Sequence, residues 1–525
     1  MADEKREIER KYESDDGGLP DLTGVGGVAA VLDKGLMELD ATYYDTADER
    51  LAAAALTLRR RTGGSDAGWH LKFPVAPGVR DEIRAPLSDT VPEEIAALVR
   101  SRVRNAELIP LVRLRSARDV RHLVDADGTL LAEASVDAVT AERLTGGGGA
   151  AQWTEIEVEL ADDGDPAFLD LVEKRLRKAG LRPSASPSKL ARALEQTATE
   201  QTATRQAGKE QNPTRQAAPG QAPGRRRGKS KQPAPPETAG DHVLAYLRAQ
   251  RDALVELDPA VRRDVPDSVH RMRVATRRAR STLRSFRSVL DRAVTDPVGA
   301  ELKWLAGELG LDRDQEVLAE RLRAGLDALP PDLVTGPVHA RLTSWAENRH
   351  GGAHSRVTGV LDSRRYLALL ETLDALLTDP PLRKAAGKQP EKVLAKAVDE
   401  DLATLSALVE QAIAAPPGEE RDIAVHEARK KAKRTRYAAE AATPALGKPA
   451  GSLTKAMKSL TTLLGDHQDS VMTRLTLREL SAVAHAAGES AFTYGVLYGR
   501  EEARAARAEA ELPGLWTEIR SAASG

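Results

Sequence analysis

The sequence of 525 residues contains no cysteine, and aromatic residues make up only 3% of it. The first absence excludes disulfides, thiolate catalysis and cysteine-based zinc sites, so any bound metal must be held by oxygen or imidazole. The second leaves few rings on which a nucleobase can stack, and Tyr43, Tyr44 and Trp69 are the main candidates in the N-terminal part.

Long apolar runs are also missing. No stretch approaches the roughly 20 residues that a membrane-spanning helix needs. The N-terminus lacks the basic-then-apolar pattern of a signal peptide. We therefore expect a cytoplasmic protein that makes no contact with membranes.

Composition and periodicity divide the chain into three parts. Residues 1–195 show mostly the period-two alternation of strands, with two short helical patterns. Residues 196–238 are rich in Gln, Pro, Ala and Arg and hold few large apolar side chains, which predicts a disordered linker. Residues 239–522 show helical periodicity, with breaks at Pro330, Pro380 and Pro416. The sequence predicts an α+β domain followed by an all-α domain.

A cluster of basic residues occurs twice in the predicted helical domain. Residues 268–280 return about 155 positions later as residues 424–436. Each copy is followed at a matching distance by a leucine, a glycine and an aspartate, which are Leu309, Gly310 and Asp314 in the first and Leu464, Gly465 and Asp469 in the second. A repeat of this length predicts a helical bundle with two-fold pseudosymmetry.

The basic residues of each copy fall on one helical stripe, because most are three or four positions apart. Neighbouring like charges repel by about 0.2–0.5 kcal/mol per pair. A solvated helix face would explain one stripe, but two matching copies favour a site for an external polyanion, above all a phosphate chain. The expected binding residues are His270, Arg273, Arg277, Arg280 and Arg284 in the first copy and His426, Arg429, Lys430, Lys433 and Arg436 in the second.

Charged and apolar residues alternate in the strands predicted around residues 7–12, 57–61, 69–73 and 153–160. A sheet with one wet face would explain any single strand. However, the last strand offers only carboxylates on its polar face, whereas Arg59 and Arg61 offer only cations. Strands that each carry charges of one sign fit the interior of a closed barrel, with acidic side chains on one side and basic side chains on the other.

Such an interior suits a phosphate substrate. Adjacent carboxylates hold Mg²⁺ or Mn²⁺ through oxygen, and Arg and Lys bind phosphate oxygens. A spare carboxylate can orient or deprotonate a water molecule. The pattern predicts metal-assisted phosphoryl hydrolysis, with Mg²⁺ or Mn²⁺ as the cofactor.

The N-terminal part resembles the CYTH family, the triphosphate tunnel metalloenzymes. Residues 7–11 (Glu-Ile-Glu-Arg-Lys) resemble the ExExK signature of that family. The resemblance continues in order through residues 58–61, 71–72, 80–82, 133–137, 155–159 and 188–189. It implies an eight-stranded antiparallel β tunnel with flanking helices.

The resemblance also implies roles for individual side chains. The implied metal ligands are Glu7, Glu9, Glu157 and Glu159, and the implied catalytic residues are Glu9, Lys11 and Glu157. The implied phosphate ligands are Lys11, Arg59, Arg61, Lys72, Arg118 and Lys189, while Glu82, Glu133, Asp137 and Glu155 complete the acidic positions. Arg118 has the opposite strand parity to Arg113 and Arg115, and we expect it to face the tunnel because it precedes an apolar run.

Residues from about Asp241 to Arg520 resemble the CHAD domain, the conserved histidine α-helical domain. Its two histidines match His270 and His426, and the family is similar to polyphosphate-binding modules. We expect Asp314 and Asp469 to orient cations of the opposite copy rather than to bind a metal, because the surrounding cations would repel a metal ion.

Together these patterns predict a metal-dependent triphosphatase for tripolyphosphate or short polyphosphate, with a helical domain that binds inorganic polyphosphate. Two alternatives stay open. The first is a non-catalytic polyphosphate-binding protein associated with polyphosphate granules. The second is a tunnel enzyme for another triphosphate, which hydrolyses thiamine triphosphate or converts ATP to cyclic AMP. Sequence-specific nucleic-acid binding is not expected. The sequence leaves the oligomeric state open.

Overall fold

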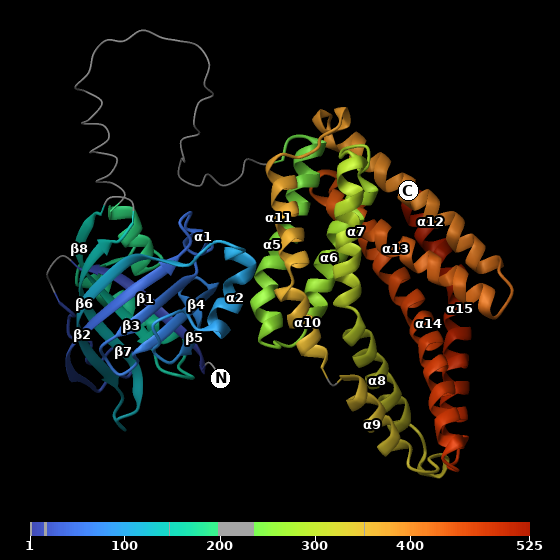
Figure 1. Ribbon diagram of the computed structural model, residues 1–525, viewed down its shortest axis with the longest axis horizontal. Helices are drawn as coiled ribbons and strands as arrows, with labels where there is room; N and C mark the ends of the chain where they lie inside the picture. Colours follow the sequence, from blue (N-terminus) through green and yellow to red (C-terminus); the bar gives the residue numbers. More distant parts are fainter. Residues whose placement is uncertain (1–2, 15–17, 146–147, 198–235, 351, 525) are drawn as a thin grey trace, which may run out of the picture. The chain divides into compact units, whose positions relative to one another are not determined.

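The computed structural model describes residues 3–14, 18–145, 148–197, 236–350 and 352–524. The chain forms two compact units, Met1–Arg225 and Arg226–Gly525. The first unit is built around a β-sheet and the second is helical (Figure 1). The predicted linker lies almost wholly outside the described residues, so its disorder and the exact domain boundaries stay predictions.

Eight strands of the first unit form a closed antiparallel barrel. They are β1 (Asp3–Ser14), β2 (Ala30–Asp45), β3 (Thr57–Thr62), β4 (Gly68–Ala76), β5 (Val79–Ala85), β6 (Ile109–Val124), β7 (Leu130–Arg143) and β8 (Ala150–Leu160). The hydrogen-bonded order is β5–β4–β3–β2–β6–β7–β8–β1, and β1 also pairs with β5. The short β9 (Arg182–Pro183) adds to β1. The predicted eight-stranded antiparallel tunnel is therefore confirmed.

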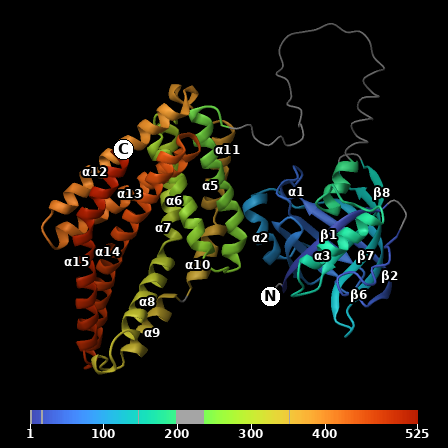
Figure 2. The ribbon, with the colours of Figure 1, turned by 180° about the vertical axis from the view of Figure 1, so that it is seen from behind.

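Helices cover two apolar patches on the outer face of the barrel. The helix α3 (Ala167–Lys178) lies on the outside of the barrel (Figure 2). Its buried residues Phe168, Val172 and Leu176 pack against the outward side chains of β1 and β8. The helix α2 (Glu93–Val103) covers β3, β4 and β5 in the same way, and the short α1 (Arg50–Ala53) lies beside it. Because successive strand residues point to opposite faces, this packing directs the alternate, charged residues into the barrel.

The described residues of the second unit form helices joined by short loops, with one isolated β-bridge between Leu290 and Leu382. Its helices are α5 (Ala239–Arg262), α6 (Ser268–Ser285), α7 (Arg292–Glu308), α8 (Leu311–Asp327), α9 (Val338–His350), α10 (Ala353–Asp362), α11 (Arg364–Thr378), α12 (Pro390–Ala414), α13 (Glu419–Leu446), α14 (Lys448–Ala486) and α15 (Phe492–Ser524), with 3₁₀ turns at Pro331–Leu333 and Lys384–Gly387. The predicted breaks at Pro330, Pro380 and Pro416 fall between helices, as expected. None of the described helices combines the length and apolar character that crossing a membrane requires.

The two copies of the basic cluster occupy α6 and α13, which contact each other. In each copy the following helix packs back on the basic one, α7 on α6 and α14 on α13. The copies differ at the glycine: α7 ends just before Gly310, whereas α14 continues through Gly465.

Candidate functional sites

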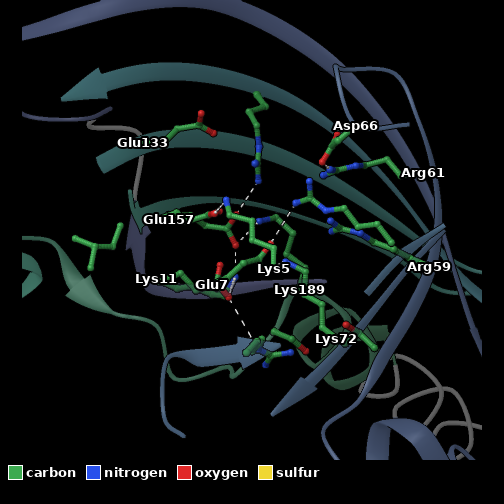
Figure 3. Close-up of a pocket in the computed structure, with 18 of the residues that line it drawn as sticks. Lys5, Glu7, Lys11, Arg59, Arg61, Asp66, Lys72, Glu133, Glu157 and Lys189 are labelled. Atoms are coloured by element: carbon green, nitrogen blue, oxygen red, sulfur yellow. Dashed lines mark hydrogen bonds and ion pairs between the residues drawn. The ribbon is translucent and has the colours of Figure 1, made fainter. Parts of the chain in front are cut away.

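The barrel encloses a cavity of about 320 Å³ whose wall is mostly charged. Its lining includes Lys5, Glu7, Glu9 and Lys11 of β1, Tyr43 of β2, Arg59 and Arg61 of β3, Lys72 of β4, Arg80 and Arg84 of β5, Arg118 of β6, Glu133 of β7, Glu157 and Glu159 of β8, and Lys189. Figure 3 shows several of these side chains converging from different strands. The structure thus gathers residues that are far apart in the sequence.

The carboxylates of β1 and β8 lie side by side because the strands pair in register, with Glu9 opposite Glu159 and Lys11 opposite Glu157. Each of the four implied metal ligands forms an ion pair with a lysine. Glu7 pairs with Lys72, Glu9 with Lys11 (3.1 Å), Glu157 with Lys11 and with Lys189 (2.6 Å), and Glu159 with Lys5 (2.8 Å). The acidic and basic side chains of the tunnel therefore neutralise one another.

Lys189 is the centre of the most compact acidic group. Its Nζ lies 2.9 Å from Asp137, 2.7 Å from Glu155 and 2.6 Å from Glu157. Burial opposes its charge, but these carboxylates outweigh burial and raise the pKa of Lys189 well above its ordinary value. Lys189 begins a helix that is capped by Ser188, whose hydroxyl accepts a hydrogen bond from the Ala191 N–H (3.1 Å).

The donor chemistry of the tunnel fits a hard divalent cation. One oxygen from each of Asp137, Glu155 and Glu157 lies within 4.8 Å of the others. The set implied by the family resemblance consists only of carboxylates as well, and it shares Glu157 with this group. Carboxylate oxygen is the ligand that Mg²⁺ and Mn²⁺ prefer. In the first group the Lys189 ammonium stands among the carboxylates, so an ion there would have to displace it.

Arg118 reaches the same acidic group from β6. Its guanidinium donates to both oxygens of Asp137 (2.7 Å each) and to Glu157 (2.7 Å). Arg113 instead pairs with Asp40, and the Arg115 side chain is 56% exposed. Of these three arginines, Arg118 is the one that lines the cavity.

Arg59 and Arg61 stand on the β3 side. Arg59 Nη1 donates to the Tyr43 hydroxyl at 3.4 Å, and Arg59 Nη2 lies 3.8 Å from Glu82. Arg61 pairs with Asp66 of the loop between β3 and β4, and Figure 3 shows the two side chains in contact. These arginines are therefore also partly neutralised by the protein.

Three of the implied acidic residues stand behind the cavity wall and hold its cations. Asp137 and Glu155 contact Lys189, and Glu82 is fully buried. Glu82 contacts Lys72 (3.4 Å), Arg84 (2.5 Å) and His70 Nδ1 (2.9 Å). Burial opposes the charge of Glu82, but His70 and Lys72 outweigh it and lower the pKa of the carboxyl group. Glu133 itself lines the cavity.

The helical unit contains a second charged site, formed by Arg273 and Arg277 of α6 with Arg429 and Lys433 of α13. Burial and repulsion by the three arginines lower the pKa of Lys433 to about 7. Burial likewise lowers the pKa of Arg277. Within the described part of the chain, Arg277, Arg429 and Lys433 form no ion pair with a carboxylate. We call these four residues the cationic cluster. Arg273 pairs with Asp314, and the other three carry charge that no ion pair with a described residue neutralises.

The remaining residues of the predicted stripes lie around this cluster. Arg280 is repelled by Arg284 and by Arg434 of the other copy, and burial with this repulsion lowers the pKa of Arg280. His270 and His426 are both partly exposed, and His426 contacts Gln468 at 2.6 Å. Arg436 stacks on the Tyr437 ring, 5.7 Å from its centre.

In the helical unit, one predicted binding residue lies apart from the cationic cluster and one expectation is wrong. Lys430 is exposed and pairs with Glu427 of its own helix, so the structure does not bring it into the cationic cluster. Asp314 pairs with Arg273 of its own copy (2.7 and 2.9 Å) rather than with a cation of the opposite copy. The reason is the α6–α7 hairpin, which returns the chain to the start of α6 before α8 begins.

Comparisons with known proteins match both units. The CYTH domain model matches residues 5–194 and the CHAD domain model matches residues 245–478. Uncharacterized protein Rv2226 of Mycobacterium tuberculosis is 37% identical over 522 residues, which cover 96% of this chain and 94% of that protein. The chain belongs to the CYTH–CHAD family.

Solved structures resemble parts of this CYTH–CHAD protein. PptA from Streptomyces chartreusis is 23% identical, with a TM-score of 0.46, and the match covers 54% of this chain and 99% of PptA. The CHAD domain from the plant Ricinus communis is 23% identical, with a TM-score of 0.42, and the match covers 57% of this chain and 97% of that domain.

Membership has a general consequence for the tunnel. CYTH proteins are metal-dependent enzymes that bind triphosphates in such a tunnel, and CHAD domains are linked to polyphosphate.

Within this CYTH–CHAD protein, sequence reasoning missed Lys5, Arg84, Asp66 and His70. Lys5 and Arg84 could have been found, because each continues the period-two pattern of Glu7 or Glu82 by one step. His70 could have been found in the same way, because it lies one step from Lys72 on β4, whereas no sequence signal pointed to Asp66.

Proposed function

We propose that this CYTH–CHAD protein is a cytoplasmic, metal-dependent triphosphatase that hydrolyses tripolyphosphate or short polyphosphate in its tunnel. The helical unit captures longer polyphosphate on the cationic cluster. The observation that carries the proposal is the tunnel wall, where lysines and arginines neutralise closely spaced carboxylates. A triphosphate supplies a new partner for these cations, and a divalent metal supplies one for the carboxylates.

The acidic and basic side chains of the tunnel have different roles. Glu7, Glu9, Glu157 and Glu159 hold the cation, and Lys11, Arg59, Arg61, Lys72, Arg118 and Lys189 bind phosphate oxygens. Bound Mg²⁺ or Mn²⁺ neutralises charge on the phosphate oxygens. Burial opposes the charge of Glu9, but Lys11, Lys72 and Lys189 together outweigh it and keep the pKa of Glu9 below its ordinary value. Glu9 is therefore ionised and suited to orient the attacking water.

The lining of the cavity also supports an inorganic substrate. Tyr43 is the one aromatic side chain among the described residues that line it, and Tyr43 is occupied with Arg59. A nucleobase or a thiazole ring gains binding energy by stacking on aromatic rings. A bare phosphate chain needs only the cations, which supports tripolyphosphate over ATP or thiamine triphosphate.

The test is phosphate release from tripolyphosphate, long-chain polyphosphate and ATP, with Mg²⁺ or Mn²⁺ and with the metal chelated. We expect release from tripolyphosphate in preference to ATP, dependent on the metal. Glu9→Gln should reduce it about 100-fold or more, since it removes the ionised group that orients the water.

Asp81→Asn is the matched control, because Asp81 is a carboxylate of the same barrel that pairs with the exposed Arg6. It should leave release unchanged. A wild type that releases no phosphate from any substrate, yet binds polyphosphate tightly, would show a non-catalytic binding protein. A preference for ATP or thiamine triphosphate would show a different tunnel reaction.

A further inference from the structure

The Leu-Gly pair that follows each basic copy has a structural explanation in the first copy. Gly310 is the N-cap of α8 and has φ −93° and ψ −26°. Any residue adopts this right-handed conformation, so the backbone does not require glycine here. Leu309, its neighbour, is fully buried and fixes the position of this turn.

The space above Gly310 is taken by an arginine. A Cβ atom at position 310 would lie 2.6 Å from Nη2, 2.7 Å from Cζ and 2.9 Å from Nε of Arg273. These three nearest atoms all belong to that one guanidinium. The missing side chain of Gly310 therefore makes room for Arg273.

Arg273 is held in this place from a second side. Asp314, one turn further along α8, accepts hydrogen bonds from Nη1 (2.7 Å) and Nη2 (2.9 Å). The Arg273 side chain is only 18% exposed, whereas Asp314 is 69% exposed. In this position Arg273 is close enough to repel both Arg277 and Lys433. Asp314 thus holds Arg273, and Gly310 leaves the space for it in the cationic cluster.

The second copy offers more space. A Cβ atom on Gly465 would lie 3.6 Å from Nη2 and 3.7 Å from Nε of Arg429, which is ordinary van der Waals contact. A methyl group therefore fits at Gly465 without moving Arg429, but it does not fit at Gly310 without moving Arg273.

We propose that Gly310 is a positioning residue for polyphosphate binding, because its bare surface lets the Arg273 guanidinium lie against the α7–α8 junction beside Arg277, Arg429 and Lys433. The inference rests on the proposed polyphosphate binding by the helical unit. It assigns a role to one half of the repeated Leu-Gly motif and makes the two halves unequal.

The test is the affinity of the full chain for long-chain polyphosphate, measured by calorimetry for wild type, Gly310→Ala and Gly465→Ala. Gly310→Ala should bind about tenfold more weakly, as expected for the loss of one charge-assisted contact. Gly465→Ala should bind within about twofold of wild type. Helix content and thermal midpoint are recorded for each variant, because a displaced arginine leaves the fold intact.

A double-mutant cycle separates the arginine from a general effect on the helix. In an Arg273→Ala background, Gly310→Ala should cause no further loss of affinity. An equal loss in both backgrounds would overturn the role of Gly310, as would unchanged binding by Gly310→Ala. If wild type itself does not bind polyphosphate, the proposed binding function fails first, and this inference falls with it.

Discussion

Lys433 shows how one residue reports on the cationic cluster. It stands where the first copy has Arg277, and its neighbours are arginines from both copies. Burial and these neighbours lower the pKa of Lys433 to about 7 from 10.5, so the folded protein binds this proton more weakly than the unfolded chain does. A bound polyanion would reverse the effect by stabilising the charged ammonium.

Affinity for polyphosphate should therefore depend on pH above neutrality. Above about pH 7 the free protein has lost the Lys433 proton and must regain it on binding, so affinity falls by up to about tenfold per pH unit. Below about pH 7 this dependence should disappear. Calorimetry at pH 8 in two buffers of different ionisation enthalpy should show proton uptake, which Lys433→Arg should abolish because arginine keeps its charge. Equal uptake in both proteins would contradict the assignment.

The same pKa shift affects stability in the opposite sense. The unfolded chain carries more protons than the folded protein between about pH 7 and 10.5, so the free energy of unfolding rises with pH in this range. Below about pH 7 both states are protonated, and the full penalty for the buried charge remains. Polyphosphate should relieve this penalty and raise the thermal midpoint most at pH 7 or below.

At the scale of elements, alternation along the strands explains most of what the sequence could predict about the tunnel. Period two assigned Glu7, Glu9 and Lys11 to one face, and the barrel places them together in the lumen. Alternation contains no information about register between strands, which decides that Glu9 lies opposite Glu159. It also could not reveal Asp66, because a loop side chain follows no period.

In the helical unit, the sequence predicted the individual helices better than the contacts between them. Spacing identified the basic stripes and the proline breaks, but not how the helices meet. The sequence therefore missed that Asp314 returns to Arg273 of its own copy, since this contact depends on the α6–α7 hairpin. The contact of Arg434 with the other copy could not be predicted either. The Arg434 side chain reaches α6 and donates to Ser285 Oγ (3.2 Å), and this depends on how α6 and α13 pack.

The helix α3 supports the tunnel from outside, which gives a prediction for the element. Leu176→Ala removes a fully buried side chain between α3 and the barrel and should cost about 2–5 kcal/mol of unfolding free energy. Leu171→Ala, on the exposed face of the same helix at 49% exposure, should change it by no more than about 0.5 kcal/mol. Denaturant titration compares the two, and equal effects would contradict this packing.

At the scale of the whole molecule, the chain combines two anion sites of different design. The tunnel offers both signs of charge, paired with each other, and can exchange these partners for a metal and a triphosphate. The cationic cluster offers one sign, largely unpaired, and so suits capture without chemistry. The different charges of the two sites thus predict that the tunnel hydrolyses phosphate chains and that the cationic cluster only binds them.

The double variant Arg273→Ala with Arg429→Ala tests this division most directly. It should bind long-chain polyphosphate about 100-fold more weakly, because two charge-assisted contacts are lost. Its release of phosphate from tripolyphosphate should stay within about twofold of wild type. A control with the same loss of charge, Arg292→Ala with Arg520→Ala, removes two exposed arginines outside the cluster and should leave both properties unchanged. Loss of binding and hydrolysis together in the first variant would contradict the account.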